Sequence, residues 1–231
     1  EFGVKHIIVI DHHIVDEEKK TKSADVLINW HLSNVQEMCA SGEVFQFIRG
    51  VRWVTKKVNP VEFLAYAAIG TIADVSPIEG DNRIIVKNGL KPYALNSIMA
   101  SGLNALISKS RVYGELSVED VAFKIAPKLN AAGRLKDPHI AYNLLVEHDL
   151  ITAELMAQNL AEFNNSRREL QKGIELQAIE MVKSEPDKYK HGIIVFSKDW
   201  HIGVLGIVAS KLTEEFYRPA IVVGMNEGTL K

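Results

Sequence analysis

One helical pattern constrains this chain more than any other feature. Apolar residues recur at helical spacing from Ala153 to about Lys183, roughly 30 residues where the average globular helix has about 10–14. Thr152 is the expected N-cap, and Pro186 follows the end of the pattern. So long a helix, followed by a new strand pattern, predicts a connector between two lobes. We expect a larger α/β lobe at about 1–150, the connector at 151–187 and a smaller, incomplete α/β lobe at 188–231.

Short apolar runs set the predicted fold class. Three β-branched, almost continuously apolar runs predict strands, at Lys5–Ile10, Gly192–Phe196 and Ala220–Val223. Runs of this kind suit parallel strands that helices cover on both faces. Shorter helices are predicted over Val61–Ile72 and over Val118–Lys128, the second capped by Ser117. The pattern as a whole favours an α/β fold with a parallel sheet.

Composition narrows the classes of partner. The 231 residues carry 27 Lys+Arg and 29 Asp+Glu, a net charge of −2, so any nucleic-acid site would be a local basic groove and not a general positive field. The single cysteine, Cys39, has no internal disulfide partner, and we expect a reducing, cytoplasmic compartment. No apolar run approaches the ~20 residues that span a bilayer, so no membrane partner is expected. The charged run Asp16–Lys22 predicts a solvated loop.

The first chemical signal is Asp11-His12-His13, which directly follows the first predicted strand. Ligand sites in open α/β sheets collect at the carboxyl ends of strands. Carboxylate and imidazole groups together are ligands for first-row transition metals such as Mn, Fe, Co or Zn. The alternative is a surface turn in which the histidines have no function.

A second candidate is Asp74, at the end of an apolar helix that Pro77 stops. A carboxylate is disfavoured at a helix C-terminus because it meets the negative end of the helix dipole. A position that is unfavourable for stability is a mild indication of function. The alternative is a helix-terminal aspartate that lies in water.

The segment Ala126–Leu135 predicts a helix that breaks into small residues, where a backbone can approach a ligand closely. Lys128, Asn130 and Arg134 surround this break, and Arg is the side chain best shaped for a bidentate phosphate contact. The alternative is an ordinary helix end with Gly133 in the left-handed position.

The segment Asp199–Leu212 leaves a strand and enters a helix that has two glycines near its start. A helix N-terminus can bind an anion, and glycine permits close backbone approach. His201 would add a charge-assisted bond to a phosphate, and Trp200 would stack on a base. The alternative is tight packing of strand on helix around a buried Trp200.

Taken together, four blocks give the chain a recognisable pattern. The blocks are VIDHH at 9–13, AIGTIADVSPIEGDNRIIVKNGL at 68–90, APKLNAAGRL at 126–135 and DWHIGVLGIVASKL at 199–212. With these blocks the chain resembles the RecJ branch of the DHH phosphoesterases, whose members degrade single-stranded DNA from the 5′ end with Mn²⁺ or Mg²⁺ in recombination and repair. The resemblance implies a parallel-sheet DHH lobe, a long connector helix and a DHH-associated lobe. It also implies single-stranded DNA and repair or recombination proteins as partners.

The resemblance implies a role for each candidate residue. His12 and Asp74 would be metal ligands, His13 would face the scissile phosphate and Asp11 would support the site, the last two as catalytic residues. Asn130 and Arg134 match residues that line the nucleic-acid path, and we group Lys128 with them. His201 matches a residue near the phosphates in the second lobe. The implied mechanism is hydrolysis assisted by two cations.

The sequence also departs from the family pattern. The family's first aspartate motifs lie upstream of its DHH block, and a Gly/Ser-rich phosphate-binding stretch would begin after Lys231. We therefore expect a fragment, inactive alone, whose two-metal site takes its remaining ligands from upstream. The segment 29–58 fits the family pattern poorly, although Ser41–Gly50 is interpreted as a diverged version of its helix.

Two other functions stay open on this sequence. A DHH-family phosphodiesterase acting on short oligonucleotides or cyclic dinucleotides would use the same metal chemistry in a closed pocket. A non-catalytic nucleic-acid-binding scaffold would explain the basic residues, but it gives no reason for a DHH triplet after a buried strand.

Overall fold

The computed structural model describes residues 3–14, 24–32, 36–95, 101–112, 114–226 and 228–231. The predicted loop Asp16–Lys22 lies outside these residues. The chain forms two compact units, which are Glu1–Pro127 with Asn143–Ala157, and Lys128–Tyr142 with Gln158–Lys231. We call them the first and the second unit. The domain limits expected at 150 and 187 stay predictions.

A pair of parallel strands begins the first unit. β1 (Ile8–Ile10) pairs with β2 (Val26–Ile28), with Val9 opposite Leu27. β1 is shorter than the predicted strand because the pairing with β2 covers only three residues. The helices of this unit follow β2 and the short 3-10 turn η2 (Trp30–Leu32): α1 (Ala40–Thr55), α2 (Val61–Ala73), α3 (Gly80–Gly89), α4 (Pro92–Leu95), α5 (Ser101–Lys109) and α6 (Val118–Asp120). Helix α8 (His139–Leu145) begins in the second unit and ends in the first.

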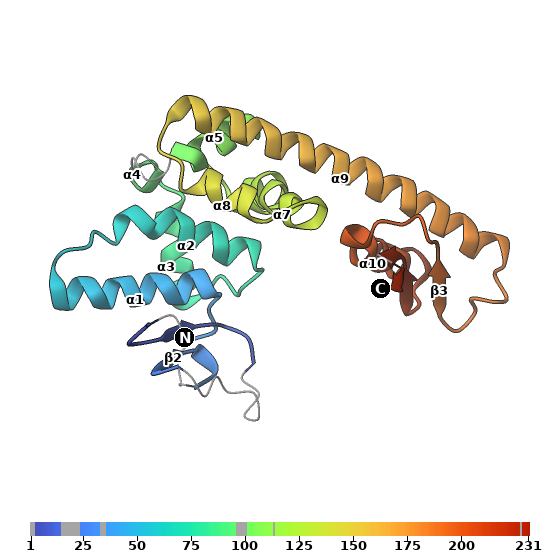
Figure 1. Ribbon diagram of the computed structural model, residues 1–231, viewed down its shortest axis with the longest axis horizontal. Helices are drawn as coiled ribbons and strands as arrows, with labels where there is room; N and C mark the ends of the chain where they lie inside the picture. Colours follow the sequence, from blue (N-terminus) through green and yellow to red (C-terminus); the bar gives the residue numbers. More distant parts are fainter. Residues whose placement is uncertain (1–2, 15–23, 33–35, 96–100, 113, 227) are drawn as a thin grey trace. The chain divides into compact units, whose positions relative to one another are not determined.

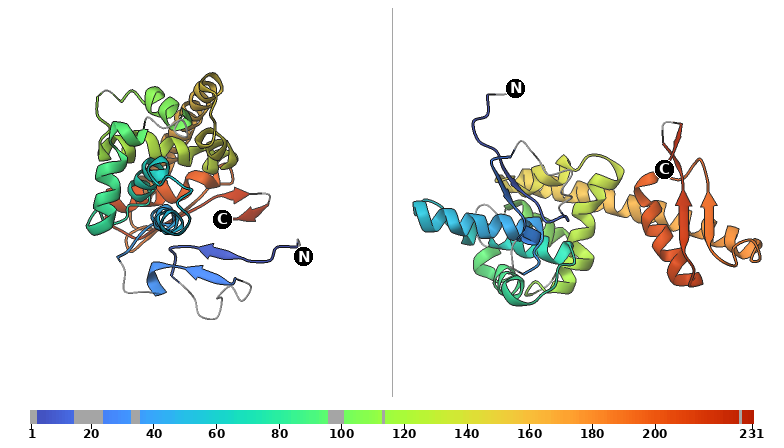
Figure 2. Two further views of the ribbon diagram at one scale, coloured as in Figure 1. Left: turned by 90° about the vertical axis from the view of Figure 1, so that its left-hand side faces the viewer. Right: turned by 90° about the horizontal axis from the view of Figure 1, so that it is seen from below.

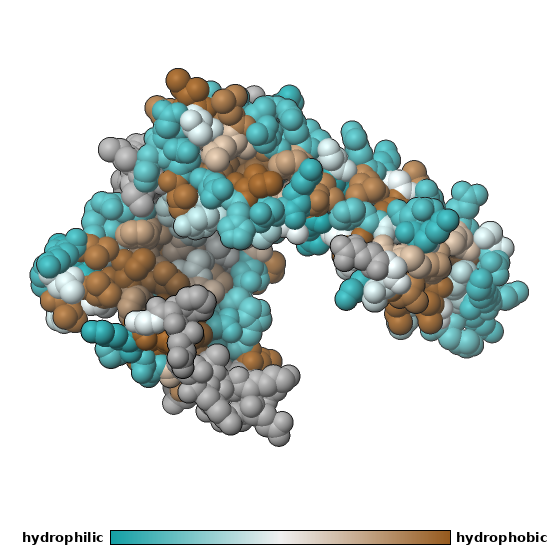
Figure 3. Space-filling view, in the orientation of Figure 1, coloured by the Kyte–Doolittle hydropathy of each residue, from teal (hydrophilic) through white to brown (hydrophobic). Residues whose placement is uncertain are grey.

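Helix α2 forms the centre of the first unit. It is apolar almost throughout, and Ala65, Ala68 and Ile72 are among its buried residues. Helix α3 packs along it, and a Cβ atom on Gly89 would lie 2.5 Å from the carbonyl oxygen of Leu64. Only glycine therefore permits this close approach of the two helices. Apolar side chains also gather on the surface over α1 (Figure 3).

The helix predicted over Val118–Lys128 is confirmed at its start, but it is not one continuous α-helix. Ser117 accepts a hydrogen bond from the Asp120 backbone N–H, and the Asp120 carboxylate accepts one from the Ser117 backbone N–H, which completes a capping box. The chain then forms a π-helical turn, η4 (Val121–Ile125), before α7 (Ala126–Leu135) begins. A π turn is one residue wider than an α turn, and such turns are frequent at functional sites.

The predicted long helix is confirmed as α9 (Leu150–Ser184), which has 35 residues (Figure 1). The predicted N-cap is wrong. Thr152 lies inside the first turn, where its backbone N–H donates to Asp149 Oδ1 at 2.8 Å. The Asp149 backbone carbonyl accepts from Ala153, so Asp149 holds the capping position. Its carboxylate is also favoured by the positive end of the helix dipole.

The second unit contains a parallel pair of strands covered by helices. β3 (Ile193–Phe196) pairs with β4 (Ala220–Val223), close to the predicted ranges, and both lie beside α10 (Leu205–Phe216) (Figure 2). A 3-10 turn, η5 (Ile202–Val204), leads into α10, and β5 (Met225–Asn226) pairs antiparallel with β6 (Thr229–Leu230). The core combines the C-terminal part of α9 with β3, β4 and α10, and its residues include Ile174, Val182, Val195, Trp200, Leu205 and Val208.

These small parallel sheets and the helices around them confirm the predicted α/β class. Among the residues that the structure describes, no helix is both long enough and apolar enough to cross a membrane.

Candidate active site

The end of strand β1 places three ionisable residues in one tight turn. The backbone N–H of Asp11 still donates to Ile28 on β2, so the strand fixes the start of the turn. Asp11 Oδ1 then accepts from the His12 backbone N–H at 2.9 Å and lies 2.7 Å from Nδ1 of His13. The hydrogen bond from His13 holds the pKa of Asp11 below its usual value. Asp11 is therefore an ionised carboxylate that orients the His13 ring and holds the His12 backbone in the turn.

Helix α2 brings Asp74 to this turn from a distant part of the sequence. His12 Nε2 lies 3.5 Å from Asp74 Oδ1, and the Ser76 hydroxyl donates to Asp74 Oδ2 at 3.2 Å. The two residues predicted as metal ligands are thus neighbours, each with one ligand atom turned to the other. The simple interpretation of Asp74 as a helix end in water does not account for this pairing.

The backbone after Asp74 is strained. Val75 has φ +60°, and the bonds from Val75 N–H to Ile72 and from Ser76 N–H to Thr71 form the Schellman arrangement that usually takes glycine at the Val75 position. A β-branched residue in this conformation costs about 1–3 kcal/mol. The strain is located directly beside the carboxylate that faces His12.

The donor set fits a divalent transition-metal ion. Asp11, His12 and His13 each offer a ligand atom, and these atoms lie within 4.8 Å of one another. Imidazole nitrogen and carboxylate oxygen together suit Mn²⁺, and Mg²⁺ is satisfied mainly by the carboxylates and water. Asp74 adds a further carboxylate oxygen next to this group, since its Oδ1 lies 3.5 Å from His12 Nε2.

In the second unit, the predicted nucleic-acid residues Arg134 and His201 meet at Gly203. Arg134 Nη1 donates to the Gly203 carbonyl at 3.3 Å, and the Gly203 N–H donates to His201 Nδ1 at 3.1 Å. A Cβ on Gly203 would lie 2.0 Å from the carbonyl oxygen of Arg134, so this junction of α7 and η5 requires glycine. Asn130 is exposed one turn earlier on α7, and Lys128 lies near the start of that helix.

Three interpretations of these segments need correction. The break predicted within Ala126–Leu135 is wrong, because α7 continues to Leu135 and the irregular turn lies upstream in η4. Gly133 lies inside α7 and has no left-handed conformation. Trp200 is only 2% exposed, and its indole N–H donates to Gln177 Oε1 at 2.7 Å. Trp200 is therefore a core residue that cannot stack on a base.

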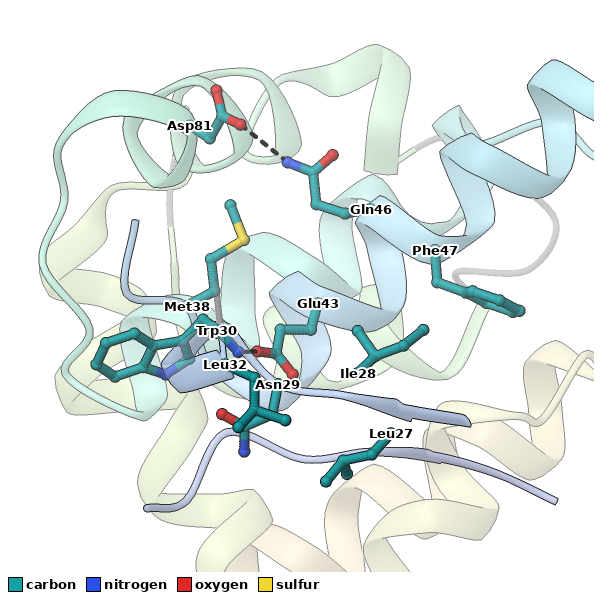
Figure 4. A pocket seen from close by; sticks show the side chains of 10 residues that line it. All are labelled: Leu27, Ile28, Asn29, Trp30, Leu32, Met38, Glu43, Gln46, Phe47 and Asp81. Atoms are coloured by element: carbon teal, nitrogen blue, oxygen red, sulfur yellow. Dashed lines mark hydrogen bonds between the residues drawn. The ribbon is translucent and has the colours of Figure 1, made fainter. Parts of the chain in front are cut away.

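Sequence reasoning missed a group of polar residues beside the DHH turn. The Asn29 side-chain amide donates to the His13 carbonyl at 2.8 Å, and Glu43 of α1 accepts from the Trp30 backbone N–H at 2.6 Å. Both line an apolar pocket of about 510 Å³ between β2 and α1 (Figure 4). The predicted helix Ser41–Gly50 lies within α1. The sequence offered one signal for this group, which is the position of Glu43 on the face of that helix that becomes buried.

Comparisons with known proteins identify the family, although no family model matches the chain. The chain is 32% identical to the single-stranded-DNA-specific exonuclease RecJ of Dickeya dadantii, over 97% of its own length and 42% of that protein. The RecJ protein of Thermus thermophilus is 32% identical over 100% of this chain and 33% of its own length. The RecJ protein of Bacillus subtilis is 41% identical over 73% of this chain and 21% of its own length. The chain thus spans less than half the length of the curated relatives it matches.

Solved structures agree with this result. The crystal structure of RecJ from Thermus thermophilus in complex with Mn²⁺ matches 95% of this chain with a TM-score of 0.81 and 30% identity, over 32% of that protein. A crystal structure of exonuclease RecJ bound to manganese gives a TM-score of 0.82 and 30% identity over 95% of this chain and 55% of that one. From these matches in sequence and in fold, the chain belongs to the RecJ family.

Proposed function

We propose that this chain is the part of a RecJ-type exonuclease that carries the DHH turn and the start of its second lobe. The reaction is hydrolysis of phosphodiester bonds in single-stranded DNA from the 5′ end, with Mn²⁺ or Mg²⁺, in recombination and repair. The observation that carries this proposal is the pairing of His12 with Asp74 beside the Asp11–His13 pair. The RecJ relatives and their manganese-bound structures support the substrate and the metal.

In this proposal His12 Nε2 and Asp74 Oδ1 hold a cation, and Ser76 fixes the rotation of the Asp74 carboxylate. A bound divalent cation supplies a water of lowered pKa and stabilises negative charge on phosphoryl oxygens. A two-metal site needs more ligands than these residues provide, and we propose that other parts of the longer protein supply them.

His13 is the proposed catalytic residue for the scissile phosphate. Its side chain is 76% exposed, so a substrate can reach it. Because Asp11 Oδ1 can only accept, Nδ1 of His13 carries the proton of their 2.7 Å bond. This leaves Nε2 to exchange a proton with the substrate or with water. Asp11 thereby fixes both the ring orientation and the tautomer of His13.

The second unit is proposed to hold the DNA backbone. His201 Nδ1 accepts from Gly203, so Nε2 carries the proton and can donate to a phosphate oxygen. Arg134 uses one Nη1 bond on the Gly203 carbonyl and keeps further donors for a phosphate. Asn130 and Lys128 extend this surface along α7. We also propose repair and recombination proteins as partners and the cytoplasm as the compartment, where Cys39 stays reduced.

A combined binding and cleavage assay tests the proposal. The chain is mixed with Mn²⁺ and a 5′-phosphorylated single strand, with a dinucleotide in parallel and His12→Ala as the matched control. Mn²⁺ binding is followed by electron paramagnetic resonance and cleavage by gel. We expect Mn²⁺ binding that His12→Ala abolishes, together with binding of the strand. Strand cleavage by this chain would show that its own ligands suffice for activity.

Two outcomes would contradict the proposal. Cleavage of the dinucleotide alone would move the chain to the phosphodiesterases that act on short substrates. Strand binding that neither requires Mn²⁺ nor responds to it, with no Mn²⁺ bound at His12, would favour the non-catalytic scaffold.

A further inference from the structure

A stripe of cationic and aromatic residues follows the C-terminal half of α1, and the proposed mechanism gives it no role. Its members lie at helical spacing and share one side of the helix end; they are Arg49, Arg52, Trp53 and Lys56. All four are exposed. Helical residues at this spacing are commonly apolar and face the core. A stripe that is charged and exposed is therefore not explained by packing.

The stripe lines a groove of about 550 Å³, together with Pro60 from the segment that leads to α2. No acidic residue is among the described residues of its lining. Between Val44 and Val61 the chain has four basic residues and no Asp or Glu. The groove is therefore a local concentration of positive charge in a chain whose net charge is −2.

The cations of the groove have uncharged partners. Arg49 Nη1 donates to Gln46 Oε1 at 2.7 Å. Arg52 Nη1 donates to the backbone carbonyl of Lys56, at the end of α1 where the helix dipole favours a cation. Among the residues that the structure describes, none of these three cations pairs with a carboxylate. A guanidinium has five N–H donors, so both arginines keep donors for an anion.

Trp53 gives the groove a flat aromatic surface. It is 79% exposed, so the fold does not use it as a core residue. Lys56 Nζ lies 4.8 Å from the centre of the Trp53 ring, a cation–π contact that keeps the ammonium beside the ring. Proteins that bind single strands without reading their sequence combine these two features, because cations contact the phosphates and bases stack on the ring.

We propose that this groove binds single-stranded nucleic acid, with a base stacked on Trp53 and phosphates on Arg49, Arg52 and Lys56. The charge of the groove is complementary to a phosphate backbone, and the exposed indole is complementary to an unpaired base. The groove belongs to the segment 29–58, which fits the family pattern poorly, so the resemblance does not assign it. Only the choice of DNA as the strand rests on the proposed function.

The groove lies away from the DHH turn within the first unit. Trp53 comes ten residues after Glu43, which is about 15 Å along α1, and Glu43 is the residue that bonds to Trp30 beside that turn. Two views show the C-terminal end of α1 projecting away from β1 and β2 (Figures 1 and 2). The groove therefore holds a part of the strand that is not being cut, and its loss lowers affinity without a direct effect on the chemical step.

A titration followed by ¹⁹F NMR tests the stacking. The chain is labelled with 5-fluorotryptophan and titrated in EDTA with a short single-stranded oligothymidylate that has a 5′-hydroxyl end. The Trp53 signal is assigned with Trp53→Phe. We expect this signal to shift, while the signal of the buried Trp200 stays in place. Duplex DNA should not cause the shift, because its bases are already stacked on one another.

Trp53→Ala measures how much the ring contributes. Affinity is read from the fluorescence anisotropy of the same oligothymidylate, in an Arg134→Ala background that weakens the proposed surface of the second unit. Trp53→Ala should weaken binding by about 5- to 150-fold. Val54→Ala is the matched control, since Val54 is adjacent, is also 79% exposed and lies outside the groove lining. It should leave the affinity unchanged.

Lys56→Gly tests the charge without a risk to folding. Lys56 has φ +59°, the left-handed conformation that usually takes glycine at a helix end. The substitution therefore removes a cation and relieves the backbone, so the melting temperature should not fall. The salt slope of strand binding should decrease by about 0.7, the value for one phosphate contact on a single strand. Lys87→Gln, on the exposed surface of α3, should leave the slope unchanged.

Three results would overturn the proposal. They are a Trp53 signal that does not shift, equal losses of affinity in Trp53→Ala and Val54→Ala, and binding to phosphatidylserine vesicles in place of the oligothymidylate. The last result would assign the stripe to an anionic membrane surface. Since the titration contains no metal, His12→Ala should bind the oligothymidylate like the wild type. Loss of Mn²⁺ binding in His12→Ala tests the proposed function separately.

Discussion

The junction between α7 and η5 gives a quantitative test of the structure. In Gly203→Ala, the new Cβ would lie 2.0 Å from the Arg134 carbonyl oxygen and 2.9 Å from its carbon, where ordinary contacts are 3.4–4 Å. Both atoms belong to the backbone, so no side chain can rotate away and the two segments must separate. Overpacking of this kind costs about 1–3 kcal/mol. For a chain of this length, that lowers the melting temperature by about 2–12 °C.

Gly206 provides the matched control for this substitution. It lies three residues later, in the first turn of α10, and a Cβ there would meet nothing within 4 Å. Gly206→Ala should therefore raise stability by up to about 1 kcal/mol through helix propensity. The two alanines are thus expected to act in opposite directions.

Thermal unfolding followed by ¹⁹F NMR of 5-fluorotryptophan measures this difference in the second unit. Trp200 reports on that unit because it lies in its core, and its signal is assigned with Trp200→Phe. A Gly203→Ala variant as stable as the wild type would refute the close contact between Arg134 and Gly203. A Gly206→Ala variant as destabilised as Gly203→Ala would refute the reasoning from local space.

Two further predictions concern the proposed chemistry, and a third concerns the cap of α6. His13→Ala should lower hydrolysis in the active enzyme far more than strand binding, and equal losses of both would remove its catalytic role. Arg134→Ala should weaken binding of all strand sequences and reduce the salt slope by about one phosphate contact; an unchanged slope would argue against such a contact. Hydrogen bonds from Lys124 and Ser117 lower the pKa of Asp120 to about 2, so its stabilising contribution is complete above pH ~4 and is lost as the pH falls towards 2. Denaturant unfolding should therefore show a difference between wild type and Asp120→Asn at pH 6 that disappears near pH 2.

Local patterns in the sequence predicted the elements well. The strand Ala220–Val223 and the long helix α9 are confirmed, because continuous β-branched runs and sustained helical periodicity each favour one structure. The cap of α9 was predicted three positions late, at Thr152 instead of Asp149, since Thr and Asp are both good capping residues and the sequence alone does not choose between them. Of the apolar residues at helical spacing in α9, Leu160 is buried and Leu155 is exposed.

The site was predictable only in part, for a physical reason. Asp11, His12 and His13 are adjacent in sequence, and a strand end presents them together whatever the rest of the fold. The approach of Asp74 to His12 depends on how α2 packs, and the resemblance to a family supplied it. Glu43 belongs to a segment that departs from the family pattern, so neither local periodicity nor resemblance indicated it. Gly203 was expected near a ligand, and the structure places the Arg134 backbone there instead.

The π turn η4 also makes the chain sensitive to a single deletion. Because η4 contains one residue more than an α turn, removing one residue between Val121 and Ile125 would join α6 and α7 into one regular helix. Every later side chain on α7 would then rotate by about 100° around the helix axis, and Asn130 and Arg134 would leave their present face. The orientation of the proposed DNA-binding surface therefore depends on the number of residues in this turn as much as on their identity. Deletion of one residue there would turn Asn130 and Arg134 away from the surface, although both side chains would still be present in the protein.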